Sequence, residues 1–127
     1  MPRSDVIRVL VVDDDARVRR ALHDLIEVSG GMQVVATAGD LTAALAADER
    51  TSPAVALVDV LLPDQADGIE VVRALTRRGR RVVATSVSAS VRNDAVAAGA
   101  VGFVEKSPDD QRLLSVLRHS AEHSLDE

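Results

Sequence analysis

Acidic side chains directly follow two short apolar runs of this chain. Ile7–Val12 stops at Asp13-Asp14-Asp15, and Ala54–Val58 stops at Asp59. Short β-branched apolar runs are typical of buried strands. If these two strands are neighbours in a parallel sheet, at least three carboxylates meet at the same edge. Two unit charges about 4 Å apart repel by roughly 1 kcal/mol in water and about 4 kcal/mol at an effective dielectric near 20, so such a group needs a counter-ion.

The ligand chemistry of this edge points to a hard divalent cation. The chain contains no cysteine, which excludes disulfides, thiol catalysis and thiolate metal sites. Its three histidines fall on expected helices, away from the strand ends. Oxygen ligands alone favour Mg²⁺ or Mn²⁺.

Two further apolar runs end in residues that suit a phosphate group. Val82–Ser86 ends in the hydroxyls of Thr85 and Ser86, and Val101–Glu105 is followed by Lys106. Lys106 is the only lysine beside fourteen arginines, and a lysine binds phosphate as a compact point charge where arginine presents a wide fork. Each of these residues alone usually serves as a cap, a turn or a solvated side chain. Their joint placement at successive strand ends favours a site that binds an anion and a metal.

Apolar periodicity places these residues on five alternating strand–helix units, of which the second strand is Gln33–Ala38. The helices are expected from Ala16 to Val28, from Leu41 to Arg50 after the N-cap Asp40, from a capping box of Asp67 and Glu70 to Gly79, from about Val91 to Ala98, and from the N-cap Ser107 into the C-terminal region. Strict alternation implies an α/β fold with a doubly wound parallel sheet and helices on both faces. Ligands of such sheets bind at the carboxyl ends of the strands.

The size and composition of the chain suit one domain, residues 1–127, with enough apolar material for a core. No apolar run reaches the roughly 18 residues that cross a membrane, and the N-terminus lacks a secretory signal. We therefore expect a soluble cytoplasmic protein without a membrane partner. A net charge of −5 argues against nucleic-acid binding by this segment. The arginine clusters at 17–20 and 77–81 are interpreted as solvated faces, because no aromatic residues are interleaved with them.

Three motifs together resemble the receiver domains of bacterial response regulators. They are Val-Val-Asp13-Asp14-Asp15 with Arg19-Arg20, Leu-Val-Asp59-Val-Leu-Leu-Pro63 with Asp67-Gly68, and Ala98-Gly99-Ala100-Val-Gly-Phe103-Val-Glu-Lys106. The likeness covers essentially the whole chain, and the motifs stand in the family's order on the expected strands. It implies the flavodoxin-like fold of chemotaxis regulators, a five-stranded parallel sheet with strand order 2-1-3-4-5.

The resemblance implies a role for each residue of the acidic edge. Asp59 would take a phosphoryl group from a phosphohistidine, on a sensor histidine kinase or a phosphotransfer protein, and form an acyl phosphate. Mg²⁺, or Mn²⁺ in its place, would be held by Asp14 directly, by Asp13 through water, by Asp59 and by the backbone carbonyl of Leu61. Lys106 would pair with a phosphoryl oxygen. The chain would then be a signalling switch and not an enzyme, apart from self-dephosphorylation.

The resemblance also implies a route from the phosphoryl group to a surface. A hydroxyl at the end of the fourth strand would swing toward the phosphoryl group, and Phe103 would rotate inward with it. The face made by the fourth helix, the fifth strand and the fifth helix would change, and a partner or a second copy in a homodimer would read it. The hydroxyl is that of Ser86 when the count runs forward along the strand and that of Thr85 when it runs back from Gly99. Both assignments stay open at this point.

The chain departs from the family pattern at three places. The loop Pro63–Gly68 is one residue longer than usual. The segment between Ser86 and Gly99 is short, which predicts a truncated fourth helix. Ser107 follows Lys106, where many members have a proline.

Three other interpretations have less support from the residues. A phosphorylation-independent interaction module would not need Asp13, Asp59 and Lys106 together. A metal-dependent phosphohydrolase generally has a second aspartate two residues after its nucleophile, and Leu61 stands there. A dinucleotide-binding module would carry G-x-G-x-x-G after the first strand, and the sequence has none there. The choice between a stand-alone receiver and part of a longer DNA-binding regulator is open.

Overall fold

The protein folds around a sheet of five parallel strands in the order β2-β1-β3-β4-β5. The structure is a computed structural model that describes residues 6–61 and 65–122. Its elements are β1 (Ile7–Val12), α1 (Ala16–Ser29), β2 (Met32–Ala38), α2 (Leu41–Thr51), β3 (Val55–Asp59), α3 (Gln65–Arg77), β4 (Arg81–Ser86), the 3₁₀ turn η1 (Ala89–Val91), α4 (Arg92–Ala97), β5 (Gly102–Glu105) and α5 (Asp110–Glu122). The predicted doubly wound fold and its strand order are confirmed.

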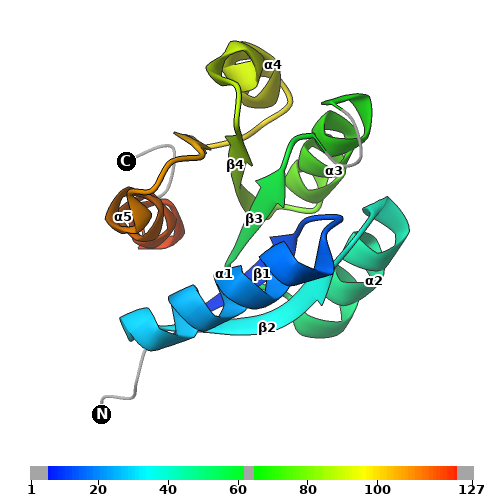
Figure 1. The fold of residues 1–127 in the computed structure, drawn as a ribbon. Helices are drawn as coiled ribbons and strands as arrows, with labels where there is room; N and C mark the ends of the chain where they lie inside the picture. The colour runs from blue at the N-terminus through cyan, green and yellow to red at the C-terminus, as the bar shows by residue number, and fades with distance from the viewer. Residues whose placement is uncertain (1–5, 62–64, 123–127) are drawn as a thin grey trace.

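Helices cover both faces of the sheet because the strand side chains alternate between two apolar cores. On one face, Leu10 and Val58 pack with α2, α3 and α4. On the other face, Val11 and Leu57 pack with α1 and α5 (Figure 1). Strands buried on both faces require continuous apolar runs, and this is why β1 and β3 are recognisable in the sequence.

The strand register brings the ends of four strands to one edge of the sheet. The opposed pairs nearest this carboxyl-terminal edge are Val12 with Val58, Asp59 with Thr85, and Ser86 with Glu105. Asp13 and Lys106 come next in the chain after β1 and β5, so they lie at the same edge. The parallel topology therefore collects the polar strand ends in one place.

Aspartates at the carboxyl-terminal edge also start two helices. The carboxylate of Asp15 accepts a hydrogen bond from the amide of Arg17 (2.8 Å) at the start of α1. The carboxylate of Asp40 accepts one from the amide of Ala43 (2.8 Å) at the start of α2, which agrees with the predicted cap. Each bond satisfies one of the amides that a helix leaves unpaired in its first turn.

Two predicted helix starts are wrong. α3 begins at Gln65, so Asp67 lies in its first turn and not at its N-cap. α5 begins at Asp110, and the preceding Asp109 accepts a hydrogen bond from the amide of Arg112 (3.2 Å), as an N-cap does. Ser107 instead accepts from the amide of Asp109 (3.1 Å), in the loop before the helix. Serine and aspartate are equally good caps, so a run of them leaves the start of a helix undetermined.

The segment around the fourth helix is short, in agreement with the spacing of the sequence. α4 has six residues, and no side-chain hydrogen bond caps its first turn. Gly99 ends the segment with a φ of 121°, and a Cβ there would lie 2.4 Å from the side chain of Thr76 on α3. Both the left-handed backbone and the close approach require glycine. Pro63, in the loop that we expected to be long for the family, lies outside the described residues, whereas residues 65–68 belong to α3.

One arginine cluster is not solvated as predicted. Asp48 on α2 is 1% exposed, and it accepts hydrogen bonds from Nε of Arg80 (2.5 Å) and Nη1 of Arg78 (3.3 Å). A buried carboxylate is tolerated when it is paired in this way. The two arginines connect α2 to the turn between α3 and β4, at the end of the sheet opposite to Asp13 and Lys106.

Gly68 brings α3 against the backbone that follows β3. A Cβ at this position would lie 1.9 Å from the carbonyl oxygen of Val60, the residue after Asp59. No side chain fits into that space unless the helix or the loop moves. The glycine therefore sets how closely α3 approaches the end of β3.

We expect Gly68→Ala to lower the free energy of unfolding by about 1–3 kcal/mol, as overpacking does. Inside a helix, alanine is otherwise about 1 kcal/mol more favourable than glycine, so the sign of the effect separates the clash from helix propensity. Urea denaturation followed by circular dichroism measures the change. An unchanged or higher stability would show that α3 moves away from Val60 without cost.

Candidate functional site

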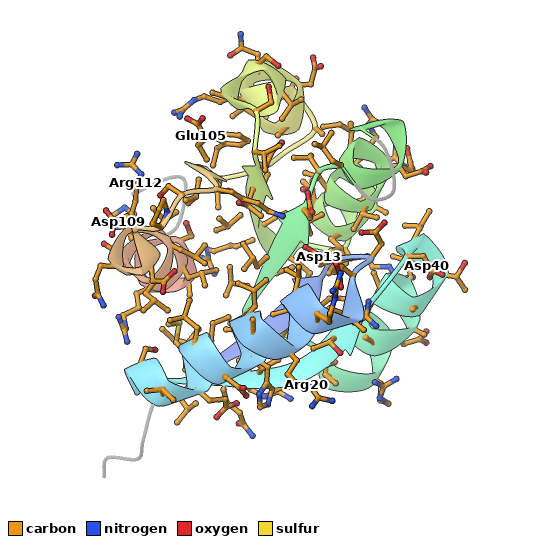
Figure 2. The ribbon with its side chains drawn as sticks, viewed as in Figure 1. Asp13, Arg20, Asp40, Glu105, Asp109 and Arg112 are labelled. Atoms are coloured by element: carbon orange, nitrogen blue, oxygen red, sulfur yellow. The ribbon has the colours of Figure 1, made fainter. Side chains whose placement is uncertain are left out.

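Two buried aspartates and one lysine meet where β1, β3 and β5 end. Nζ of Lys106 lies 3.0 Å from Oδ2 of Asp59 and 3.7 Å from Oδ2 of Asp13. Asp13 is 2% exposed and Asp59 is 8% exposed. Figure 2 shows Asp13 at the carboxyl-terminal edge of the sheet. The structure thus brings together three of the residues that the sequence analysis selected.

Backbone turns hold both carboxylates in place. Oδ1 of Asp13 accepts a hydrogen bond from the amide of Asp15 (2.9 Å), and Oδ1 of Asp59 accepts one from the amide of Leu61 (3.0 Å). In each case the donor is two residues ahead, which is the geometry of an Asx turn. The second oxygen of each carboxylate is the one that faces Lys106.

One ammonium does not balance two buried carboxylates. Among the described residues, Oδ2 of Asp13 has no hydrogen-bond partner, because Lys106 lies at ion-pair distance but beyond hydrogen-bond distance from it. Burial raises the pKa of Asp13, and the charge of Asp59 adds to the rise. The amide of Asp15 and the ammonium of Lys106 offset part of this effect. The site therefore retains an unmet demand for positive charge.

This demand fits a cation that takes few protein ligands. Among residues 6–61 and 65–122, no three acidic or imidazole side chains form a ready metal-binding cluster. Asp13 and Asp59 are adjacent, whereas Asp14 is exposed, so the structure does not bring the predicted direct ligand into the group. Mg²⁺ is commonly held by one or two carboxylates and completes its shell with water and phosphate oxygens. The unpartnered oxygen of Asp13 and the all-oxygen surroundings match that requirement.

The two hydroxyls at the end of β4 have different surroundings. Oγ1 of Thr85 donates a hydrogen bond to the carbonyl oxygen of Val104 (2.8 Å). Oγ of Ser86 accepts one from the amide of Ser88 (3.1 Å), and the carbonyl of Ser86 accepts from the amide of Lys106 (2.8 Å). Both side chains are buried. Only the hydroxyl of Thr85 already uses its proton in a bond within the sheet.

Phe103 is buried beside the fourth helix. It belongs to the core cluster that contains Ala84 of β4 and Ala95 of α4. The guanidinium of Arg92 lies over its ring, 6.0 Å from the centroid, within the range of a cation–π contact. Phe103 thus links β5, β4 and α4 in one packed group.

Sequence reasoning missed one polar contact of the site. Nη1 of Arg19 on α1 donates a hydrogen bond to the carbonyl oxygen of Asp13 (2.7 Å). Arg19 was assigned to a solvated cluster, but it is half-buried. The available signal was its position four residues after the N-cap Asp15, which places it on the first turn of α1 next to the acidic loop.

The strand order, the two-sided helical cover and the charged carboxyl-terminal edge define a flavodoxin-like α/β domain. Residues 9–118 match the response regulator receiver domain family, and the chain belongs to this family.

Relatives and solved structures agree with that assignment. The nitrate/nitrite response regulator NarP of Escherichia coli K12 is 33% identical over 98% of this chain and 59% of its own length. The DNA-binding transcriptional activator DevR/DosR of Mycobacterium tuberculosis is 40% identical over 89% of this chain and 54% of its own length. The signal receiver domain of NarL from M. tuberculosis has a TM-score of 0.84 at 28% identity, over 94% of this chain and 99% of that domain. The chain therefore spans a little more than half the length of these two curated relatives.

The chain is thus a receiver domain of two-component response regulators, a phosphorylation-accepting switch. Receiver domains interact with sensor histidine kinases. The comparisons do not favour the phosphorylation-independent module or the phosphohydrolase. In the described part of the chain, no helix has both the length and the apolar character that a membrane crossing requires.

We expect Asp13→Asn to raise the free energy of unfolding by about 1 kcal/mol in metal-free buffer, because it removes one of two repelling carboxylates from a poorly hydrated position. Asp14→Asn is the matched control, since the neighbouring carboxylate is exposed and its removal should change stability by less than about 0.5 kcal/mol. Chemical denaturation with EDTA present measures both. Equal effects, or a loss of stability in Asp13→Asn alone, would contradict the repulsion.

Proposed function

We propose that Asp59 is the residue that accepts the phosphoryl group, from a phosphohistidine on a sensor histidine kinase or on a phosphotransfer protein. The observation that carries the proposal is the position of Asp59. It is a nearly buried carboxylate at the end of the central strand β3, 3.0 Å from Lys106 and beside Asp13. Family membership supplies the reaction, and this geometry supports the choice of residue.

In the transfer, an oxygen of Asp59 forms a bond to phosphorus while the bond between phosphorus and the histidine nitrogen breaks. The electron pair of that bond leaves with the imidazole, and the product on this chain is an acyl phosphate. The amide of Leu61 and the ammonium of Lys106 hold the carboxylate in one orientation. Lys106 then pairs with the phosphoryl oxygen, where the negative charge has moved.

Asp13, Asp14, Asp59 and the carbonyl of Leu61 would hold a Mg²⁺ ion, or Mn²⁺ in its place, and the ion would supply positive charge to offset the charge of the incoming phosphoryl group. The short distances of both Asp13 and Asp59 from Lys106 support this assignment. Asp14 follows Asp13 directly in the chain, and its side chain is exposed, so it is the ligand that would have to move toward the ion.

Ser86 is the hydroxyl that we assign to the phosphoryl group. Side chains alternate along β4, so Ser86 lies on the same face as Ala84, which packs in one cluster with Phe103. Thr85 lies on the opposite face and donates its proton to Val104. The oxygen of Ser86 accepts a hydrogen bond from Ser88, which leaves its proton available to a phosphoryl oxygen.

The surface formed by α4, β5 and α5 is the part of the domain that we expect a partner to read. Phe103 lies beneath it and Ser86 lies next to it, so a movement of the hydroxyl changes the packing under α4. We propose that the partner that binds this surface is a second copy of the chain or an output domain. The name of DevR/DosR, a DNA-binding transcriptional activator, supports an output domain that binds DNA, with residues 1–127 forming one receiver domain.

Incubation with acetyl phosphate and Mg²⁺ should add about 80 Da, the mass of one phosphoryl group, to the intact protein. Asp59→Asn should abolish the addition, and EDTA should suppress it. Intact-mass spectrometry measures the product, and hydroxylamine should remove it because it is an acyl phosphate. Full addition in Asp59→Asn would reject Asp59 as the acceptor.

Ser86→Ala should leave phosphoryl acceptance within about threefold of wild type and remove most of the phosphorylation-dependent change at α4 and β5. Thr85→Val should keep that change, although it loses about 1 kcal/mol of stability with its hydrogen bond to Val104. Hydrogen exchange of the α4 and β5 amides with and without acetyl phosphate measures the change. The reverse pattern would assign the role to Thr85.

A further inference from the structure

Arg19 connects α1 to the backbone of the acidic loop. Its Nη1 donates a hydrogen bond to the carbonyl oxygen of Asp13 at 2.7 Å. The side chain is half-buried and makes no ion pair among those seen in the described part of the chain. Partial burial of a guanidinium costs desolvation free energy that the side chain would avoid on the exposed surface. The hydrogen bond to the main-chain carbonyl, next to the buried carboxylates, therefore holds Arg19 in this position.

The loop after β2 leaves space for this arginine. A Cβ at Gly39 would lie 3.0 Å from Nη1 of Arg19 and 3.9 Å from the carbonyl oxygen of Asp13. The guanidinium therefore fits between the loop after β1 and the loop after β2, and a side chain at position 39 would press on it. The absence of a side chain at Gly39 therefore leaves the room that the guanidinium of Arg19 occupies.

Arg19 completes a set of hydrogen bonds that fixes Asp13 on all but one side. The amide of Asp13 donates to the carbonyl of Ala38 (3.0 Å), its carbonyl accepts from Arg19, and its Oδ1 accepts from the amide of Asp15 (2.9 Å). Only Oδ2 is left without a hydrogen-bond partner among the described residues. The peptide between Asp13 and Asp14 is held by the same bond, because it contains that carbonyl.

We propose that Arg19 is a positioning residue, which orders the Asp13-Asp14 backbone so that this loop accepts a divalent cation without further loss of conformational freedom. The proposal rests on the proposed function, since it concerns the same cation. Residues that orient the ligands of a metal without touching the metal typically strengthen metal affinity by roughly 10- to 100-fold. The charge of Arg19 acts in the opposite direction, because a guanidinium close to the site repels a cation. The direction in which Mg²⁺ affinity changes when Arg19 is replaced therefore separates positioning from electrostatic repulsion.

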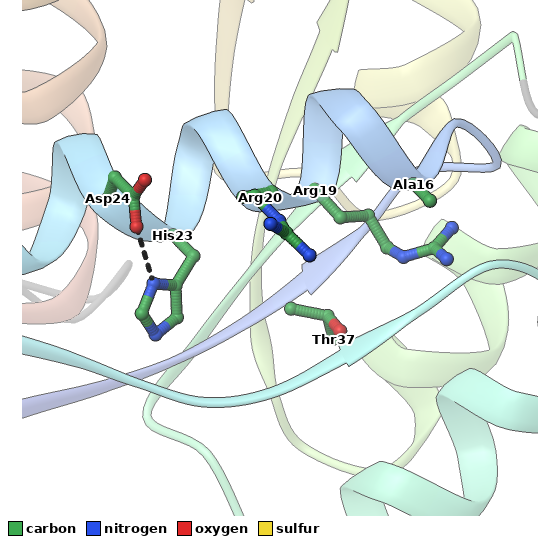
Figure 3. Close-up of a pocket in the computed structure, with 6 residues that line it drawn as sticks. All are labelled: Ala16, Arg19, Arg20, His23, Asp24 and Thr37. Carbon is green, nitrogen blue, oxygen red and sulfur yellow. Dashed lines mark hydrogen bonds and ion pairs between the residues drawn. The ribbon is translucent and has the colours of Figure 1, made fainter.

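A neighbouring arginine provides a matched control. Arg19 and Arg20 line the same open cavity of about 560 Å³, together with Ala16, His23, Asp24 and Thr37. Figure 3 shows Arg19 extending along α1 toward Ala16, while Arg20 points toward Thr37. Arg20 is exposed. Loss of either arginine removes one positive charge, but only loss of Arg19 releases the carbonyl of Asp13.

The test is thermal unfolding of the whole chain by circular dichroism at increasing MgCl₂, for wild type, Arg19→Gln, Arg19→Lys, Gly39→Ala and Arg20→Gln. The dependence of the midpoint on Mg²⁺ gives a dissociation constant, and the midpoint without Mg²⁺ reports folding. We expect a roughly tenfold weaker constant for Arg19→Gln and a smaller loss for Gly39→Ala. Arg19→Lys should recover part of the affinity because lysine can still donate to the carbonyl, and Arg20→Gln should bind like wild type or slightly tighter.

The rate of phosphorylation by acetyl phosphate gives a second measurement. In Arg19→Gln the Mg²⁺ concentration for half-maximal rate should rise about tenfold, while the rate at saturating Mg²⁺ stays within about threefold of wild type. If Arg19→Gln binds Mg²⁺ as well as wild type or more tightly, the positioning role is rejected while the proposed function stands. If wild type shows neither Mg²⁺ binding nor phosphorylation, both proposals fail. If Arg19→Gln does not fold, Gly39→Ala provides the test. An unchanged Mg²⁺ dissociation constant for Gly39→Ala would then reject the positioning role of Arg19.

Discussion

Repulsion between Asp13 and Asp59 must be balanced if both carboxylates are to stay at a poorly hydrated edge of the sheet. Parallel pairing of β1 with β3 forces them together, because Asp13 follows the last residue of β1 and Asp59 is the last residue of β3. Lys106 arrives from β5, two strands away from β3, and has to reach across the end of β4. A long flexible side chain suits this distance, and the small hydroxyl residues at the end of β4 leave room for it. The strand order thus creates one electrostatic requirement, which the lysine after β5 and the small residues at the end of β4 meet.

The charge balance at this edge is incomplete, because one oxygen of Asp13 has no hydrogen-bond partner among the described residues and the pKa of Asp13 is raised. A fully neutralised edge would be more stable but would have little affinity for further charge. Functional sites commonly carry such a cost, and the rest of the fold compensates for it. Here the compensation comes from two apolar cores and from ion pairs such as that of Asp48 with Arg80 at the far end of the sheet.

The sequence was sufficient for the architecture and for three residues of the acidic edge, Asp13, Asp59 and Lys106. Apolar runs that end in aspartate, threonine-serine or lysine place those residues at strand ends whatever the details of packing. Helix starts were less certain, because Ser107, Asp109 and Asp110 all suit a cap. Long-range partners were not accessible either. Arg80 pairs with a residue 32 positions earlier, which no sequence pattern reveals. The choice between Thr85 and Ser86 required the face of β4 on which each side chain lies.

The two flanks of the site are built differently. On one flank, α3 lies directly against the main chain after Asp59, because Gly68 has no side chain to separate them. On the other flank, α4 is less than two turns long, and no side-chain hydrogen bond caps its first turn. A short element makes few backbone hydrogen bonds of its own, and such elements open at a low free-energy cost. We therefore expect a perturbation at Asp59 to displace α4 more than α3, so that one glycine and one short helix give the domain a preferred direction of response.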